Sequence, residues 1–287
     1  MSYKTARTLG DLHAAVTGAG GGVTIFAGGT DLMVRERARV AAGPVLDVSA
    51  VPELRRVALE GPDLVLGAAV TYADCLTDPV IRRACPLLVQ VGERFASPQI
   101  RNVATLGGNV ANASPAGDGV AALWALDARV EAITPAGAIV RPISEVVLGP
   151  GRLGLPAASV LTAIRVPAAA AGEGSGFYKL VNRAYPEHPM AIAVASVAAR
   201  LRLDAEGRIV LARLVLGAVG PTPLRATAAE AALLDRTPDA ALIGGAARLV
   251  TEAARPIPDV RASAEYRHDV LAALATTALE AALRAAA

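Results

Sequence analysis

The spacing of apolar residues along the chain predicts short elements first and longer ones later. Helical spacing and helix-start signals predict helices over 10–19, 85–97 and 118–128, and another over DLMVRERARV, capped by Thr30 or Asp31. Runs of β-branched residues bounded by turn residues predict strands over 24–29, 45–49, 64–70 and 158–167. Residues 129–143 predict a hairpin around Pro135-Ala136-Gly137. Strands and helices therefore alternate in the first part of the chain.

The pattern changes at AAAAGEGSG, residues 168–176, which has no apolar periodicity and predicts a linker. Residues 190–220 then predict two long strands around the turn Asp204–Gly207, and the rest of the chain predicts helices over 227–235, 239–254 and 265–285. Strands followed by helices are typical of an α+β domain. We therefore expect one domain over residues 1–167 and a smaller α+β domain over residues 177–287.

Composition and charge exclude several classes of function. Hydrophobic residues make up 53% of the 287, but no run approaches the ~20 apolar residues of a transmembrane helix. The N-terminal MSYKTARTLG shows no apolar signal segment, so we expect a cytoplasmic protein. The 28 basic and 26 acidic residues are interspersed and leave a net charge of +2, without the basic stripe that nucleic acid would follow. We expect no membrane span and no nucleic-acid partner.

Cysteine and histidine are too sparse to suggest a metal site. Cys75 and Cys85 lie ten residues apart with no histidine nearby, and His13, His188 and His268 are widely scattered. We expect the two cysteines to be buried, reduced thiols. The sequence therefore predicts no metal bound by this chain.

Two glycine-rich stretches, IFAGGTDL (25–32) and ATLGGNVANASPAGDG (104–119), each lie between a predicted strand or extended segment and a helix start. Glycine lets backbone amides approach a ligand, and a helix N-terminus behind such a turn adds exposed amides, so each stretch is a candidate phosphate site. Together they favour a dinucleotide whose pyrophosphate meets both; the alternative is that each is only a tight turn. Neither matches G-x-G-x-x-G or the lysine-bearing P-loop.

The two stretches resemble the paired FAD-binding signature of a known family. AGGTDL (27–32) and ATLGGNVANASPAGD (104–118) are similar to the flavin subunit of the xanthine dehydrogenase and carbon monoxide dehydrogenase family, the molybdenum hydroxylases. Segments 148–167, 177–184, 215–233 and 259–279 resemble further family segments in the same order. The chain is therefore identified as a member of this family along nearly its whole length.

The resemblance implies an α+β fold: a two-subdomain FAD-binding domain (PCMH-type) followed by a smaller α+β C-terminal domain. It implies FAD as the cofactor, which we expect to be noncovalent because no His or Cys stands in a recognisable flavin-linkage motif. The implied FAD-binding residues are Ala27, Gly28, Gly29, Thr30, Asp31, Leu32, Phe95, Thr105, Gly107, Gly108, Asn109, Asp118, Leu161 and Lys179. Structural alternatives stay open for four of them: Asp118 as an N-cap, Phe95 and Leu161 as core, and Lys179 as a solvated strand residue.

In function, the resemblance implies an oxidoreductase subunit that relays electrons from iron–sulfur clusters of a molybdenum hydroxylase to NAD, oxygen or another acceptor. The implied partners are a [2Fe–2S] small subunit and a molybdenum-cofactor large subunit, because this chain lacks cysteine clusters and is too short to include the molybdenum subunit. Two alternatives remain: a free-standing FAD-dependent oxidoreductase acting on a small molecule, and a flavin-binding protein without turnover.

One segment departs from the family pattern. After FYKLVNRA, the residues YPEHP (185–189) lengthen the path into the next strand by a few residues. Prolines and glutamate favour a surface turn there. The alternative is that Tyr185 or His188 faces the flavin ring, as a gate for the acceptor or as a catalytic group that moves a proton.

Overall fold

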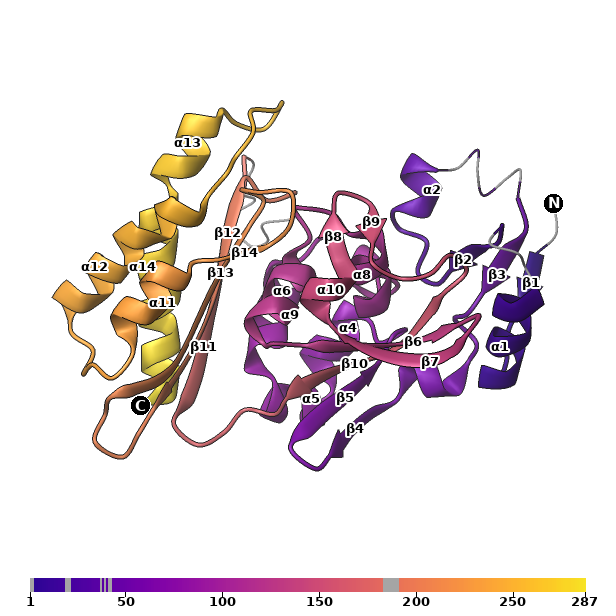
Figure 1. The fold of residues 1–287 in the computed structure, drawn as a ribbon, viewed down its shortest axis with the longest axis horizontal. Helices are drawn as coiled ribbons and strands as arrows, with labels where there is room; N and C mark the ends of the chain where they lie inside the picture. Colours follow the sequence, from indigo (N-terminus) through magenta and orange to yellow (C-terminus); the bar gives the residue numbers. More distant parts are fainter. Residues whose placement is uncertain (1–2, 19–21, 37, 39, 41–42, 183–190) are drawn as a thin grey trace.

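The computed structural model describes residues 3–18, 22–36, 38, 40, 43–182 and 191–287. Figure 1 shows two blocks side by side: an N-terminal block, coloured indigo to magenta, and a C-terminal block whose orange and yellow helices cover the outer face of a sheet. The N-terminal block contains two separate larger sheets, so it has two subdomains. The expected α+β architecture is confirmed. Within the described ranges, no helix has the length and apolar content to cross a membrane.

The first subdomain is a small parallel sheet with one long helix. Strands β1 and β2 both pair with β3 in parallel, giving the order β1-β3-β2. Helix α1 buries Leu12 and Val16 against Leu46 of β3, which confirms the helix predicted from apolar spacing. The elements are β1 Tyr3–Thr5, α1 Leu9–Gly18, β2 Thr24–Phe26, α2 Leu32–Arg35 and β3 Val45–Asp47.

The second subdomain is built on an antiparallel sheet of order β4-β5-β10-β6-β7. Strand β10 lies between β5 and β6, although it follows both in sequence. Strands β6 and β7 form the predicted hairpin, with Thr134 paired to Gly137. The elements are η1 Pro52–Arg55, β4 Val57–Glu60, β5 Asp63–Gly67, β6 Arg129–Thr134, β7 Gly137–Pro142 and β10 Val160–Pro167, with a small ribbon of β8 Val147–Gly149 and β9 Arg152–Leu153.

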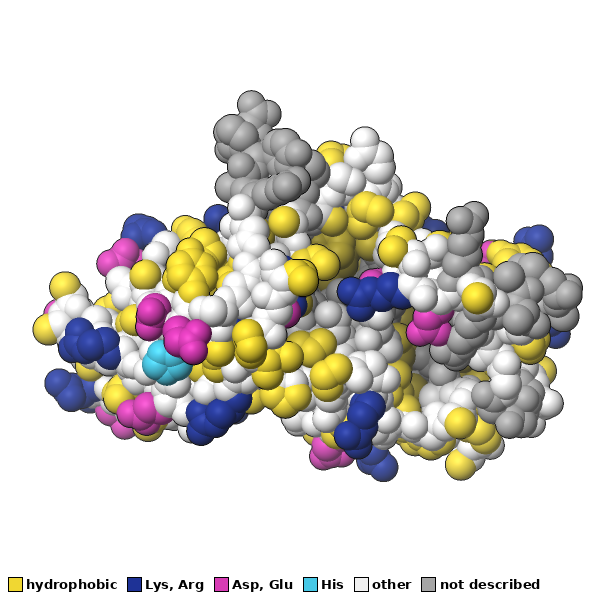
Figure 2. All heavy atoms as spheres, turned by 90° about the horizontal axis from the view of Figure 1, so that it is seen from above, with side chains coloured by type: hydrophobic (Ala, Val, Ile, Leu, Met, Phe, Trp, Pro, Cys, Tyr) yellow, Lys and Arg dark blue, Asp and Glu magenta, His cyan; other side chains and the backbone are white. Residues whose placement is uncertain are grey.

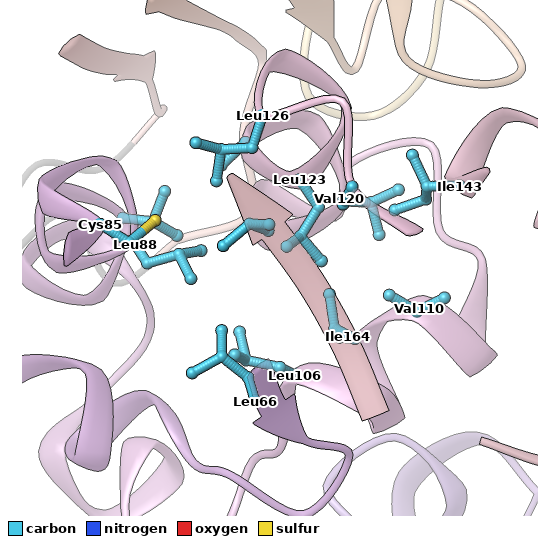
Figure 3. Packing of buried hydrophobic residues seen from close by; sticks show 14 of the residues in the cluster. Leu66, Cys85, Leu88, Leu106, Val110, Val120, Leu123, Leu126, Ile143 and Ile164 are labelled. Atoms are coloured by element: carbon cyan, nitrogen blue, oxygen red, sulfur yellow. The ribbon is translucent and has the colours of Figure 1, made fainter. Parts of the chain in front are cut away.

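Seven helices cover this sheet among the described residues. Three of them start with a proline, which suits the first turn because its missing N–H has no partner there anyway. Figure 3 shows Leu66 and Ile164 of the sheet with Leu106 and Leu123 of two covering helices in one apolar cluster. The helices are α4 Tyr72–Thr77, α5 Pro79–Ala84, α6 Pro86–Arg94, α7 Pro98–Arg101, α8 Leu106–Asn112, α9 Asp118–Ala125 and α10 Ile143–Val146.

The C-terminal block is an antiparallel sheet of order β11-β12-β13-β14 with helices on its outer face (Figure 1). Val197, Ala199 and Leu201 of β12 belong to the core beneath the C-terminal helices, and Ala198 belongs to the core shared with the second subdomain. The strand is therefore buried on both faces along most of its length. The elements are β11 Glu173–Leu180, β12 Ala195–Leu203, β13 Ile209–Gly217, β14 Leu224–Arg225, α11 Thr227–Leu233, α12 Ala240–Leu249, η2 Val250–Ala253, α13 Ala264–Asp269 and α14 Leu271–Ala286.

Residues 168–176 differ from the linker that their composition predicts. Strand β11 begins at Glu173, so the second half of this segment belongs to the sheet. A Cβ at Gly174 would clash with the carbonyl oxygen of Ala282, and one at Gly176 with that of Ala278, both on α14. These glycines therefore serve the close packing of a helix on a strand rather than chain flexibility.

The two blocks share one continuous core. Phe177, Ala198 and Val215 of the C-terminal sheet belong to the same buried cluster as the helices of the second subdomain. The side chain of Gln90 on α6 donates a hydrogen bond to the Ser175 carbonyl (3.0 Å) and accepts one from the Phe177 amide (2.8 Å). This side chain thus satisfies backbone groups on the outer edge of β11, as a neighbouring strand would.

Candidate functional site

A cavity of about 770 Å³ lies where the first subdomain meets the second. Its wall comes from three segments: residues 23–36, residues 104–115 and residues 150–161, with Tyr72 and Phe95 adding aromatic rings. Every residue for which the family resemblance implies a contact with FAD lines this cavity, except Asp118 and Lys179. The structure therefore brings the two glycine-rich stretches to one site.

Gly28 and Gly107 allow close contacts with other parts of the chain instead of facing a ligand. A Cβ at Gly28 would clash with the carbonyl of Val103, immediately before the second stretch. A Cβ at Gly107 would lie 2.6 Å from the carbonyl oxygen of Ala68. Gly29 has φ +68°, in the left-handed region that a residue without a Cβ adopts freely. Gly108 differs because it is exposed on the cavity wall and a Cβ there would meet only the Thr105 side chain.

The hydrogen bonds of the second stretch correct one expectation. The amides at the start of α8 are already bonded: Leu106 N–H to Val70 O (2.9 Å), Gly107 N–H to Ala68 O (2.9 Å) and Gly108 N–H to the Thr105 hydroxyl (3.0 Å). The expectation that this helix presents free amides to a phosphate is therefore wrong. Thr105 caps the helix with its side chain and closes the site from this side.

The first stretch differs from the second in the hydrogen bonding of its backbone amides. Among the residues that the structure describes, none accepts a hydrogen bond from the amides of Gly28 to Leu32. Asp31 stands at the N-cap of α2 without a side-chain capping bond, contrary to the capping role expected for Thr30 or Asp31. Instead its carboxylate lies 3.7 Å from Arg35 at the surface. The amides of residues 28–32 are therefore available to an anion in the cavity.

Asp118 and Lys179 form a buried ion pair behind the cavity. Lys179 Nζ lies 2.6 Å from Asp118 Oδ2, with 2% and 6% of the two side chains exposed, and also donates to the Ala191 carbonyl (3.3 Å). Burial raises the pKa of Asp118, and the ammonium group of Lys179 opposes that rise. Gly117, not Asp118, is the N-cap of α9. Both structural alternatives, a capping aspartate and a solvated lysine, are therefore wrong.

Three oxygen atoms near the cavity are buried without a hydrogen-bond partner. They are the hydroxyl of Tyr72, Oδ1 of Asn109 and Oδ1 of Asp118. The Tyr72 hydroxyl and Asn109 Oδ1 lie close together over Gly119, since a Cβ there would clash with the first and lie 3.0 Å from the second. Burial also raises the pKa of Tyr72 well above its ordinary value, so it remains a neutral phenol. These oxygens are closed off from the cavity, so they form part of its supporting wall and not of its ligand-binding surface.

Apolar and aromatic groups complete the wall. Leu161 lines the cavity at 8% exposure, and Phe95 lines it with its ring stacked on Tyr72, the centroids being 3.7 Å apart. Each of the two can serve the core and the cavity together. The cavity thus offers backbone amides on one side and apolar and aromatic surface on another, which fits the phosphate and ring parts of a dinucleotide.

Sequence patterns missed several wall residues. Tyr72 lies between the predicted strand 64–70 and the predicted helix 85–97, and nothing local marks it as part of a site. The segment GPGRLGLPAAS, rich in turn residues, contributes four more wall residues: Pro150, Gly151, Pro156 and Ser159. Its composition predicts a loop, and this was the sequence feature that could have suggested a place in the site. Asn112 and Ser114 lie within the second glycine stretch itself.

The candidate catalytic residues, Tyr185 and His188, lie outside the described residues.

Cys75 and Cys85 are free and buried, and burial raises the pKa of the Cys85 thiol to about 12. In the described part of the chain, no group of three His, Cys, Asp or Glu side chains is placed to hold a metal ion.

Comparison with protein families gives two matches that divide the chain. Residues 1–169 match the FAD-binding domain in molybdopterin dehydrogenase. Residues 177–282 match the CO dehydrogenase flavoprotein C-terminal domain. The break between the two matches falls at the start of β11.

Known proteins resemble the chain over its full length. The carbon monoxide dehydrogenase medium chain of Hydrogenophaga pseudoflava is 29% identical over 98% of this chain and 96% of its own. The xanthine dehydrogenase FAD-binding subunit of Escherichia coli O157:H7 is 30% identical over 99% and 97%. A solved carbon monoxide dehydrogenase from H. pseudoflava, lacking the Mo-pyranopterin moiety of its cofactor, superposes with a TM-score of 0.91 at 30% identity, covering 99% of this chain and 97% of that one. Quinoline 2-oxidoreductase from Pseudomonas putida 86 gives a TM-score of 0.90 at 27% identity, covering 100% and 98%.

Proposed function

Because this chain belongs to the family of FAD-binding medium subunits of the molybdenum hydroxylases, we propose that it holds FAD noncovalently and relays electrons from iron–sulfur clusters of a partner subunit to an acceptor such as NAD or oxygen. The main support for this proposal is the cavity where the two glycine-rich stretches meet. When bound, FAD supplies the redox chemistry, since its isoalloxazine ring takes up electrons singly or in pairs.

The residues of the cavity have separate roles in this proposal. The amides of residues 28–32 hold the pyrophosphate, because no described residue accepts a hydrogen bond from them. Tyr72 and Asn109 line the cavity, but the Tyr72 hydroxyl and Asn109 Oδ1 are themselves buried, so these two atoms support the wall and do not contact the cofactor. Leu161 and Phe95 contact a ring of the cofactor. Thr105, Gly107 and Gly108 shape the opposite wall, and Asp118 with Lys179 supports it from behind.

The relay role rests on what this chain lacks and on its surface. Its two cysteines are too few for a cysteine-ligated iron–sulfur cluster, so electrons must come from another chain. Ile192, Ile257 and Val260 are more than half exposed, and Figure 2 shows hydrophobic side chains in patches across the middle of one face. Such surface suits a permanent partner. We propose a [2Fe–2S] small subunit and a molybdenum-cofactor large subunit as those partners, in the cytoplasm, where Cys75 and Cys85 would stay reduced.

The test is co-expression with the genes that neighbour this one, followed by size-exclusion chromatography and metal analysis. We expect the chain to elute in an assembly that contains iron and molybdenum. If it elutes alone with FAD, and its photoreduced flavin is reoxidised by a small organic molecule with turnover, the free-standing oxidoreductase is correct. If the flavin is bound but exchanges no electrons with any acceptor, the protein only binds FAD.

A further inference from the structure

Ala218, the first residue after β13, joins the C-terminal block to the wall of the cavity. Its amide donates a hydrogen bond to the carbonyl of Pro115 (2.9 Å). Pro115 belongs to the second glycine-rich stretch and lines the cavity. The end of β13 is therefore bonded directly to a segment that encloses the site.

The backbone of Ala218 has a conformation that an alanine rarely adopts. Its φ is +63°, in the left-handed region where a Cβ lies too close to the following carbonyl oxygen. A glycine would take up this conformation freely. An alanine keeps it only where the surrounding structure holds its backbone in place.

Arg267 on α13 holds the other side of this residue. Its Nη1 donates to the carbonyls of Ala218 (2.9 Å) and Val194 (2.6 Å). The arginine is only 1% exposed, so these carbonyls and the Asp259 carboxylate take the place of water around its charge. Ala218 is thus fixed at its carbonyl by Arg267 and at its amide by Pro115.

Arg267 is itself fixed by a second set of contacts. Its Nη2 donates to Asp259 Oδ1 (2.6 Å), and Asp259 Oδ2 accepts from Arg261 (2.6 Å). Arg261 also donates to the carbonyl of Ala193 (2.9 Å), just before β12. The guanidinium of Arg267 therefore has little freedom to move away from Ala218.

We propose that Arg267 is a positioning residue for the cofactor site, which holds Ala218 in its left-handed conformation and thereby sets the place of Pro115 in the wall. The inference rests on the proposed FAD site and gives the C-terminal domain a part in FAD binding. Arg267 does not line the cavity, so any effect on FAD must pass through Ala218 and Pro115.

The experiment measures the affinity of apo-protein for FAD at a temperature where circular dichroism shows each variant folded. Arg267→Met and Arg267→Lys should each weaken FAD binding by about 10-fold, a usual size for a residue that acts on a site without touching it. Lysine keeps the charge but lacks the fork of donors that spans several acceptors. Hydrogen exchange followed by mass spectrometry should show faster exchange in the peptide that contains Ala218, because its bond to Pro115 opens more often.

The matched control is Arg200→Met. Arg200 on β12 is also a buried arginine, 5% exposed, and its guanidinium binds both carboxylate oxygens of Glu173 (2.7 and 3.0 Å). It does not line the cavity. Arg200→Met should lower thermal stability as Arg267→Met does, but leave FAD affinity and the exchange of the Ala218 peptide unchanged per folded molecule.

Ala218→Gly separates positioning from general loosening. Alone it should bind FAD like the parent, because glycine adopts the same φ without strain. In the Arg267→Lys background it should recover most of the lost FAD affinity, since the backbone then needs less support.

The inference is overturned if the Arg267 variants bind FAD like the parent, or if Arg200→Met weakens FAD binding as much as they do. It is also overturned if Ala218→Gly restores none of the affinity lost in Arg267→Lys, or if the exchange of the Ala218 peptide stays that of the parent. If Arg267→Met does not fold, Arg267→Lys decides alone. Failure of the parent protein to bind FAD would instead refute the proposed function, so the two failures are distinguishable.

Discussion

Lys179 and Asp118 join the two blocks of the molecule at a point that water does not reach. Lys179 lies on β11 of the C-terminal sheet and Asp118 in the first turn of α9, with their charged atoms 2.6 Å apart. The ammonium group compensates a carboxylate whose pKa burial alone would raise further. Removing either partner leaves the other charge buried and unpaired.

Lys179→Met should destabilise the protein by about 3 to 5 kcal/mol, the usual cost of leaving one half of a buried pair uncompensated. The measurement is urea unfolding of the apo-protein at neutral pH. Asp118→Asn combined with Lys179→Met should recover much of the loss, because no charge is then buried. The deficit of the single variant should also shrink as pH falls, since Asp118 takes up a proton more readily folded than unfolded. Equal stability of Lys179→Met and the parent would contradict this account.

Asp259 has the opposite pH dependence. Hydrogen bonds from Arg261 lower its pKa below the ordinary value of 3.8, and Arg267 contributes as well. A lowered folded pKa stabilises the protein above pH 3.8 and loses that stabilisation as pH falls further. Asp259→Asn should therefore melt at a lower temperature than the parent at pH 6, with the difference narrowing at pH 3. Asp269→Asn, at an exposed site, is the control and should change the melting temperature neither at pH 6 nor at pH 3.

Gly108→Val should abolish FAD retention and leave most secondary structure intact. A Cβ at this exposed position of the cavity wall lies 2.7 Å from the Thr105 hydroxyl, so the branched side chain must turn into the space of the ligand. Flavin content after desalting measures the effect. Gly217→Val, whose Cβ would meet Ser196 between the two blocks, should lower stability without a specific effect on FAD. Unchanged FAD binding by Gly108→Val would remove the second stretch from the site.

The cofactor itself should be released by heat. We expect the purified protein to be yellow and its denatured supernatant to contain FAD, identified by absorption and by mass. Flavin remaining on the precipitated chain would show a covalent bond. A colourless protein that gains no flavin on titration with FAD would refute FAD binding altogether.

Local patterns predicted much of the molecule. Apolar spacing identified α1, runs of β-branched residues identified β5 and β10, and the turn residues 135–137 located the β6–β7 hairpin, because these features depend on neighbours within a few residues. The glycine-rich stretches marked both loops that line the cavity, and the match to a family extended that prediction to the fold and the cofactor. The choice of acceptor stays a prediction.

Tertiary structure decided what the same residues do. Gly28 and Gly107 serve contacts with Val103 and Ala68, and Gly174 serves a contact with α14, none of which a glycine shows by itself. The first two amides of α8, those of Leu106 and Gly107, are bonded to Val70 and Ala68, more than thirty positions earlier, and are therefore not free for a phosphate. Asp118 pairs with Lys179 only because the C-terminal sheet packs on α9. The sequence by itself determined the elements and the class of ligand; partners far apart in the chain were set by packing, which no local pattern encodes.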